Sequence, residues 1–165
     1  MSYRTITQVA DAFGGDAATI SYRLRQYRVL HTAGLVPAAS REGRGKTATA
    51  LFDEAGTCTF RLFSRLTEDF SFSTAMASGT IVSLNSSVRP GTSLPDALKG
   101  IRAGEAWSLI LDILPDKRIA GHFERDGASI ESDKAEEIMQ SAGYPAMLLG
   151  RLVIPCSDLL KPLLV

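Results

Sequence analysis

The double glycine at Gly14 and Gly15 constrains this chain more than any other feature, because it interrupts two helical patterns. Residues 5–13 and 17–28 lie on either side of it and both carry helix-forming sequences. Glycine readily adopts the positive φ angles that end a helix, and Asp16 can cap the next helix through its carboxylate. The sequence therefore predicts two helices joined by a short turn.

Each predicted helix has an apolar face. In the first, Val9, Ala10 and Phe13 form a stripe, and Thr5 or Thr7 can cap the first turn. In the second, the residues spaced at i, i+4, i+7 and i+11 are assigned to the core, namely Ile20, Leu24, Tyr27 and His31. The residues that then face away are Tyr22, Arg25, Gln26 and Val29.

The outward face of the second helix suits the major groove of DNA. Arginine can donate two hydrogen bonds to guanine, glutamine can pair with adenine, and tyrosine can reach a phosphate. Arg25 and Gln26 are therefore candidates for base contacts, and Tyr22 is a candidate for a phosphate contact. A solvated helix face with ordinary arginines is the alternative interpretation.

A basic hairpin is predicted to follow the second helix. Residues 34–39 and 47–52 are β-prone runs, and the segment between them is rich in glycine and cations. Its three cations, Arg41, Arg44 and Lys46, have few apolar neighbours in the sequence, so we expect them to be exposed. A flexible basic tip of this kind follows a phosphate backbone or enters a minor groove.

Taken together, these residues resemble the MerR type of winged helix-turn-helix DNA-binding domain. Residues 5–14 match its Ile-x-x-Val-Ala-x-x-Phe-Gly helix, and residues 19–22 match the start of its recognition helix. Residues 34–37, Gly-Leu-Val-Pro, match the segment that leads into the wing, and Phe52 stands where a tyrosine closes it. The resemblance covers about the first 65 residues.

The resemblance implies that the second helix reads bases and that the hairpin, or wing, contacts phosphates. Ser21 stands where the family has arginine, and the stretch from Thr19 to Gly34 is about two helical turns longer than in the family. The expected DNA contacts are Thr19, Ser21, Tyr22, Arg25 and Gln26 on the helix and Arg41, Arg44 and Lys46 on the wing.

The distribution of charge agrees with this interpretation. The whole chain is neutral, but residues 1–65 hold nine Lys/Arg and five Asp/Glu, a net charge of +4. The remainder carries −4. A basic part joined to an acidic part is typical of a phosphate-contacting module linked to a partner-contacting one, although chance asymmetry is the alternative.

The rest of the chain predicts a boundary and a second domain. Asp53 can cap a third helix that runs to about Thr67. Residues 70–91 are rich in serine and threonine, with 81–84 as a strand-like island, and are interpreted as a linker or edge strand. The expected domains are therefore 1–69 (winged helix-turn-helix), 70–91 and 92–165.

The C-terminal domain is predicted to be a small α+β unit for dimerisation or effector binding, so the chain as a whole belongs to the α+β class. A short helix lies between Pro95 and Gly104, and residues 107–114 and 118–124 form a hairpin. Another helix begins at residue 132 or 133, and a final strand covers 147–154. The apolar tail at 159–165 must dock on its own core or, by preference, on another subunit.

The sequence offers little evidence for catalysis, a metal or a cofactor. Residues 40–47 approach a phosphate-binding loop, but Ser40 replaces its first glycine and Pro37 lies just upstream. Cys58 and Cys156 lack metal-ligand spacing. The remaining candidates are interpreted as a solvated turn (Asp112, Asp116, Glu124, Asp126) and as structural histidines (His31, His122).

The sequence therefore favours a bacterial or phage-type transcription regulator that binds double-stranded DNA and pairs through its C-terminal domain, not an enzyme. We expect it in the cytoplasm, because neither a signal peptide nor an apolar run of about 18 residues occurs. One alternative is a DNA architectural or packaging factor, such as an excisionase or small terminase subunit. Another is a protein-interaction adaptor.

Overall fold

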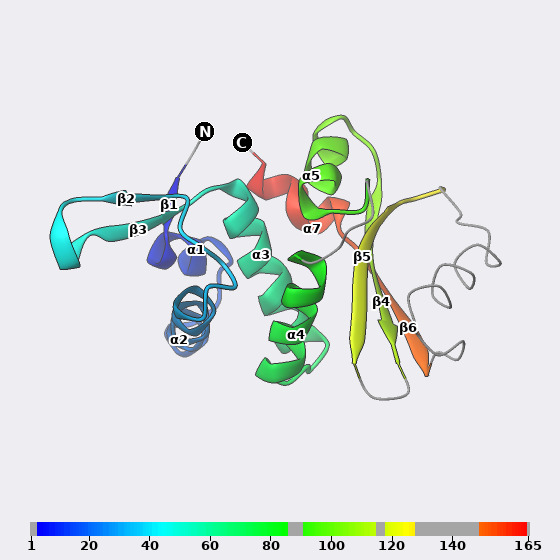
Figure 1. The fold of residues 1–165 in the computed structure, drawn as a ribbon, viewed down its shortest axis with the longest axis horizontal. Helices are drawn as coiled ribbons and strands as arrows, with labels where there is room; N and C mark the ends of the chain where they lie inside the picture. Colours follow the sequence, from blue (N-terminus) through cyan, green and yellow to red (C-terminus); the bar gives the residue numbers. More distant parts are fainter. Residues whose placement is uncertain (1–2, 86–90, 115–117, 128–148, 165) are drawn as a thin grey trace. The chain divides into compact units, whose positions relative to one another are not determined.

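The computed structural model describes residues 3–85, 91–114, 118–127 and 149–164 and contains both helices and sheets (Figure 1). This mixture agrees with the α+β class expected from the sequence. The chain divides into two compact units. We call residues 1–81 with 162–165 the head and residues 82–161 the body, and describe each by itself.

The first two helices of the head lie where they are predicted, but the buried face of the second differs from the expected one. Helix α1 (Ile6–Ala12) is capped by Thr5, whose side chain and that of Gln8 form a capping box. The turn that follows uses positive φ at Gly14 (66°) and Gly15 (108°). Helix α2 (Ala17–Thr32) begins after Asp16, whose Oδ1 accepts a hydrogen bond from the Thr19 amide at 2.8 Å. Capping and glycine chemistry thus set the turn. The buried residues of α2 are Arg23, Tyr27 and Leu30, whereas Ile20, Leu24 and His31 are only half-buried.

The hairpin of the head starts later than predicted, and an earlier strand joins its sheet. Strands β1 (Arg4–Thr5), β2 (Ser40–Glu42) and β3 (Thr49–Phe52) pair antiparallel in the order β1-β3-β2, with a 3₁₀ turn (Gly45–Thr47) between β2 and β3. The predicted strand at 34–39 is wrong. Gly34, with φ 74°, ends α2, so these residues lead the chain out of the helix.

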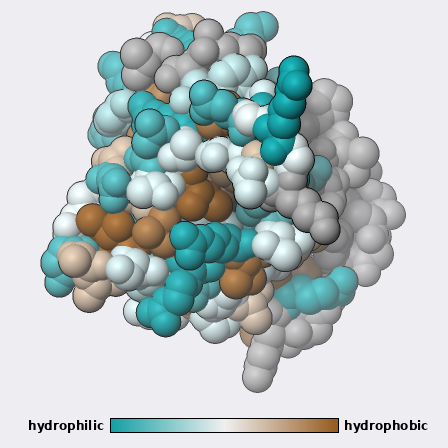
Figure 2. Space-filling model, turned by 90° about the vertical axis from the view of Figure 1, so that its left-hand side faces the viewer, coloured by the Kyte–Doolittle hydropathy of each residue, from teal (hydrophilic) through white to brown (hydrophobic). Residues whose placement is uncertain are grey.

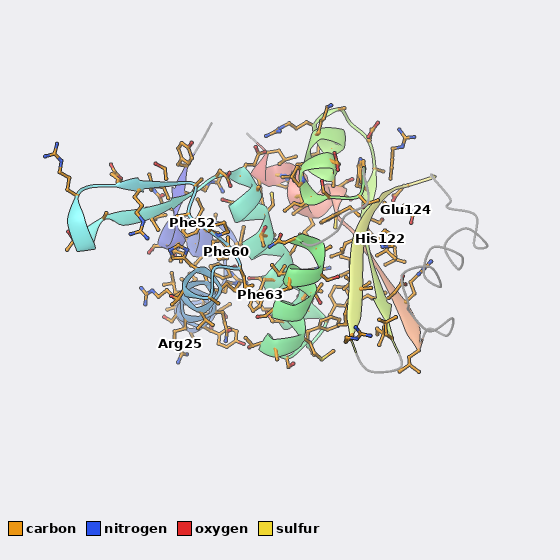
Figure 3. The ribbon with its side chains drawn as sticks, in the orientation of Figure 1. Arg25, Phe52, Phe60, Phe63, His122 and Glu124 are labelled. Carbon is orange, nitrogen blue, oxygen red and sulfur yellow. The ribbon has the colours of Figure 1, made fainter. Side chains whose placement is uncertain are left out.

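An aromatic cluster joins α2, β3 and the third helix of the head. Helix α3 (Glu54–Ser64) is capped by Asp53, as predicted, and continues into a π-helical turn (Arg65–Asp69). Tyr27 stacks on Phe60 with ring centroids 4.5 Å apart. Phe60 meets Phe52 edge to face at 5.0 Å, and Figure 3 labels both residues. All three rings are fully buried, so they form the centre of the head's core.

Residues 74–85 form helix α4 (Thr74–Asn85), which corrects the interpretation of 70–91 as a linker or edge strand. The buried residues fall at i, i+3, i+4 and i+7, which is a helical spacing: Ala77, Thr80, Ile81 and Leu84. The Ser73 hydroxyl also accepts a hydrogen bond from the Met76 amide at 3.2 Å, as a helix cap does. The division between head and body falls inside this helix.

The body combines one helix with a three-stranded sheet. Helix α5 (Leu94–Arg102) buries Leu94, Ala97, Leu98 and Ile101, as predicted. Strands β4 (Trp107–Ile113), β5 (Ile119–Arg125) and β6 (Gly150–Pro155) lie in the order β5-β4-β6, all antiparallel. The predicted hairpin and final strand are confirmed. The helix expected from residue 132 lies outside the described residues.

The C-terminal tail docks on its own chain. Its composition favours contact with another subunit, but helix α7 (Ser157–Leu160) lies against α5, and Leu160 is fully buried. A short 3₁₀ turn (Lys161–Leu163) follows. The expectation of a subunit contact is therefore corrected for the first part of the tail.

Gly100 in α5 provides a test of the packing in the body. A Cβ atom at this position would lie 2.1 Å from Trp107 Nε1 and 2.4 Å from Glu105 Oε2. We expect Gly100→Ala to lower the free energy of unfolding by about 1–3 kcal/mol, because the indole must shift. Thermal and urea unfolding of the full chain measure this change.

Gly79 in α4 is the matched control, because nothing lies within 4 Å of a Cβ placed there. Gly79→Ala should leave stability unchanged or raise it by about 0.5–1 kcal/mol, since alanine favours the helix. Equal stability of the two variants would contradict the packing described for Gly100.

Candidate nucleic-acid interface

The front face of α2 exposes polar, cationic and apolar side chains. Tyr22 and Arg25 are exposed, in agreement with the face predicted from helical spacing, and Ser21 is exposed beside them. Figure 3 shows Arg25 on the side of α2 that faces away from the buried rings of the head. Val29, one turn further along, is 56% exposed. These positions are free to contact a partner.

Two of the predicted contact residues are only partly exposed and make contacts within the head. Gln26 is only partly exposed, and its Oε1 accepts a hydrogen bond from the Thr74 hydroxyl at 3.3 Å. Thr19 is also half-buried, and its amide hydrogen bond lowers the pKa of Asp16 below the usual range. Gln26 thus ties α2 to the start of α4, and Thr19 belongs to the first turn of α2.

Arg28 is a candidate contact that the sequence analysis did not single out. It is exposed, and it lies three residues after Arg25 and seven after Ser21, so the three share one face of the helix. The helical spacing was sufficient to find it. With Arg25, it gives the front of α2 two cations about one turn apart.

The hairpin of β2 and β3 carries the second group of cations. Arg41 lies in β2 opposite Ala50, not at the tip as predicted, and Arg44 lies in the turn. Both arginines are exposed, and Lys46 belongs to the 3₁₀ turn. Figure 2 shows the molecule from the hairpin side, where hydrophilic side chains project beside a hydrophobic patch.

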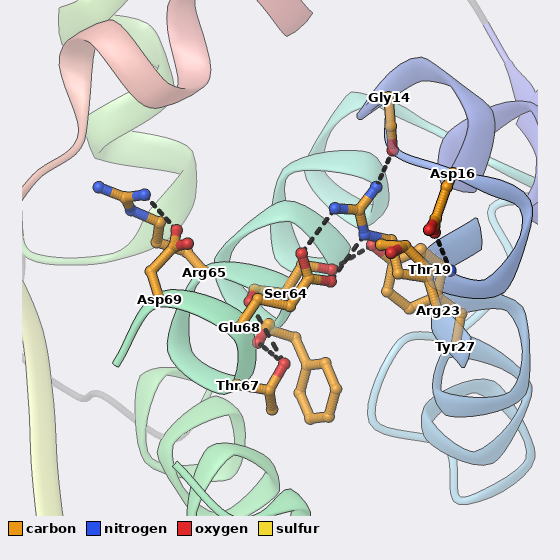
Figure 4. Close-up of polar contacts among 11 residues, drawn as sticks. Gly14, Asp16, Thr19, Arg23, Tyr27, Ser64, Arg65, Thr67, Glu68 and Asp69 are labelled. Atoms are coloured by element: carbon orange, nitrogen blue, oxygen red, sulfur yellow. Dashed lines mark hydrogen bonds and ion pairs between the residues drawn. The ribbon is translucent and has the colours of Figure 1, made fainter. Parts of the chain in front are cut away.

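Arg23 fastens the back of α2 to two other parts of the head. Its side chain is 7% exposed, and its Nε and Nη2 each donate to a Glu68 carboxylate oxygen at 2.6 Å (Figure 4). Its Nη1 donates to the Gly14 carbonyl. Hydrogen bonding to Glu68 raises the pKa of Arg23 above the ordinary arginine value. This arginine adds to the basic charge count but cannot contact a phosphate.

A buried hydrogen bond between Tyr27 and Ser64 adds a further tie between α2 and α3. Burial raises the pKa of Tyr27 to about 12, so the phenol stays protonated at neutral pH. Helix α1 is held from another side, because the Arg61 guanidinium lies 4.8 Å above the centre of the Phe13 ring. The two helices and the turn between them therefore have a defined position on α3.

The acidic and histidine candidates take structural positions. Asp112 was expected in a solvated turn, but it lies buried in β4, where Arg151 donates to it at 2.7 and 3.2 Å. His31 Nδ1 lies 3.0 Å from the Val36 carbonyl oxygen, and His122 and Glu124 lie on β5. Asp116 lies outside the described residues.

The two thiols are buried, and burial raises the pKa of Cys156 to about 12. Within the part of the chain that the structure describes, no group of three or more His, Cys, Asp and Glu residues is arranged to hold a metal ion. In the same residues, none of the helices is long and apolar enough to span a membrane.

Removing the charge of Glu68 tests the anchoring of α2. We expect Glu68→Gln to lower the free energy of unfolding by about 1–3 kcal/mol, because Arg23 then stays buried without its carboxylate. The lower part of this range allows for solvent screening, since the Glu68 side chain is 26% exposed. Thermal unfolding measures the effect.

The neighbouring pair of Arg65 and Asp69 is the control. Both side chains are 43% exposed, so Asp69→Asn should change stability by no more than about 0.5 kcal/mol. If the two variants lost the same stability, Glu68 would have no special role in holding α2.

No protein-family model matches this chain, and no curated protein sequence matches it. The feature of the head that bears on function is its geometry: a helix with a fixed back and a cationic front, next to a basic hairpin.

Proposed function

We propose that the head binds double-stranded DNA as a MerR-type winged helix-turn-helix and that the protein is a bacterial or phage-type transcription regulator acting as a homodimer. The observation that carries this proposal is the asymmetry of α2. Arg23 and Tyr27 fix its back, whereas Ser21, Arg25 and Arg28 are exposed on its front. A helix held in this way is preorganised for a groove.

In the proposed complex, α2 lies in the major groove. This helix has 16 residues and is therefore about 24 Å long. The major groove is wide enough for the cross-section of an α-helix. Arg25 would read a guanine through two hydrogen bonds, while Arg28 and the Tyr22 hydroxyl would contact phosphates. Fixing the back of the helix limits the entropy lost when these contacts form.

The hairpin would supply affinity more than sequence choice. Arg41 and Arg44 are exposed on a strand and a turn, and β3 is held in place by β1 on its other side. Cations on such a hairpin neutralise phosphates and release counterions, which makes binding weaker as salt rises. Of the basic residues in the head, Arg23 would take no part, because Glu68 neutralises it.

One observation favours the adaptor alternative. Tyr22 and Val29 are 40% and 56% exposed and lie seven residues apart, on one side of α2. Exposed aromatic and aliphatic side chains of this kind are typical of protein contacts. An adaptor that uses this face would bind a protein partner and would show no affinity for DNA, even at low salt.

Selection of a binding site from random duplexes, followed by anisotropy titrations, tests the DNA proposal. We expect Arg25→Ala to weaken binding to the selected site by about 10- to 100-fold while leaving random DNA little affected, because a bidentate base contact is lost. Arg44→Ala should weaken both duplexes equally and lower the salt slope by about one.

Lys99→Ala is the control, because this exposed lysine belongs to α5 in the body. It should bind like the wild type. Failure of the wild type to bind any duplex at low salt would refute the proposal and favour the adaptor. If Arg25→Ala and Arg44→Ala behaved alike, the roles given to helix and hairpin would be wrong.

A further inference from the structure

The two edges of the sheet in the body differ. At the β5 edge, the outward amides of Gly121 and Phe123 donate to Ser83 Oγ and to the Thr92 carbonyl, each at 3.0 Å. The β6 edge is the opposite one (Figure 1). Among the described residues, none donates or accepts a main-chain hydrogen bond on the outer side of β6. One edge is therefore covered, and the other has no main-chain partner among the described residues.

The register of β6 identifies its outward groups. The Cys156 amide donates to the Trp107 carbonyl at 2.8 Å, continuing the ladder between β6 and β4. Along an antiparallel strand, the amide and carbonyl of successive residues point alternately to one side and the other. Every second residue of β6 therefore directs these groups toward β4. Arg151 and Val153 therefore direct their amides and carbonyls outward. Pro155 directs only a carbonyl outward, because proline has no amide hydrogen.

We propose that β6 pairs with β6 of a second copy of this chain, so that the two body sheets join into one continuous antiparallel sheet. An antiparallel pairing of identical strands obeys a two-fold axis, so one edge supplies both partners. Registers centred on residue 152 or 153 use both outward amides of each copy. This pairing turns β6 from the last strand of a sheet into an interior strand.

The side chains along β6 favour a second copy as the occupant. Val153 is 50% exposed and Leu149 is 59% exposed, so a neighbouring strand would cover apolar area on both copies. The charge of Arg151 on each copy would repel the other edge if it were unpaired, but its guanidinium is paired with the buried carboxylate of Asp112. Two β6 edges can therefore approach without bringing uncompensated guanidinium groups together.

This inference extends the proposed function, since a dimer would present two heads to two half-sites, but its test needs no DNA. Light scattering and sedimentation of the full chain should show a dimer that dissociates on dilution. Val153→Lys places an unpaired charge on the edge and should weaken the dimer about tenfold or more. Val29→Lys changes an equally exposed valine in the head and should leave the dimer intact.

Hydrogen exchange gives a second measurement on the wild type, independent of any variant. The amides of Arg151 and Val153 should gain protection as the protein concentration rises. Three results would each overturn the inference. They are a monomer at all concentrations, a Val153→Lys dimer as strong as that of the wild type, and exchange at these amides that does not depend on protein concentration. DNA binding by a monomeric wild type would separate this failure from failure of the proposed function.

Discussion

The pairing of Arg23 with Glu68 is the interaction on which the arrangement of the head depends. It joins the back of α2 to the π-helical turn after α3, and a third bond reaches the Gly14 carbonyl at the turn between α1 and α2. A buried guanidinium without partners is costly, so an arrangement that separates Arg23 from Glu68 is disfavoured. Together with the Tyr27–Ser64 bond and the Arg61–Phe13 contact, this pairing holds both N-terminal helices on α3.

The consequence is a helix with two different sides. Its back is occupied by Arg23, Tyr27 and Gln26, each of which has a polar partner on a later element. Its front carries Arg25 and Arg28, and the hairpin beside it carries exposed arginines of its own. Rigid support behind a cationic surface is what recognition of a regular, charged duplex requires, and it underlies the function proposed above.

Sequence patterns predicted the local features of the fold and missed the long-range ones. The turn at Gly14 and the caps at Thr5 and Asp16 depend on neighbouring residues alone, so they could be predicted. The partner of Arg23 lies 45 residues away, and no local pattern identifies it. The β-branched run at 81–84 favours a strand, but burial of Ala77, Thr80 and Ile81 on one face makes it helical.

Guanine methylation interference distinguishes an Arg25 that reads a guanine in the major groove from one that contacts only phosphate. Methylation at N7 removes the acceptor that an arginine would use. We expect that methylating one guanine in a selected duplex blocks binding of the wild type and has no effect on binding of Arg25→Ala. The role of Arg25 would be contradicted if no methylated guanine disturbed binding of the wild type, or if methylation interfered equally with both proteins.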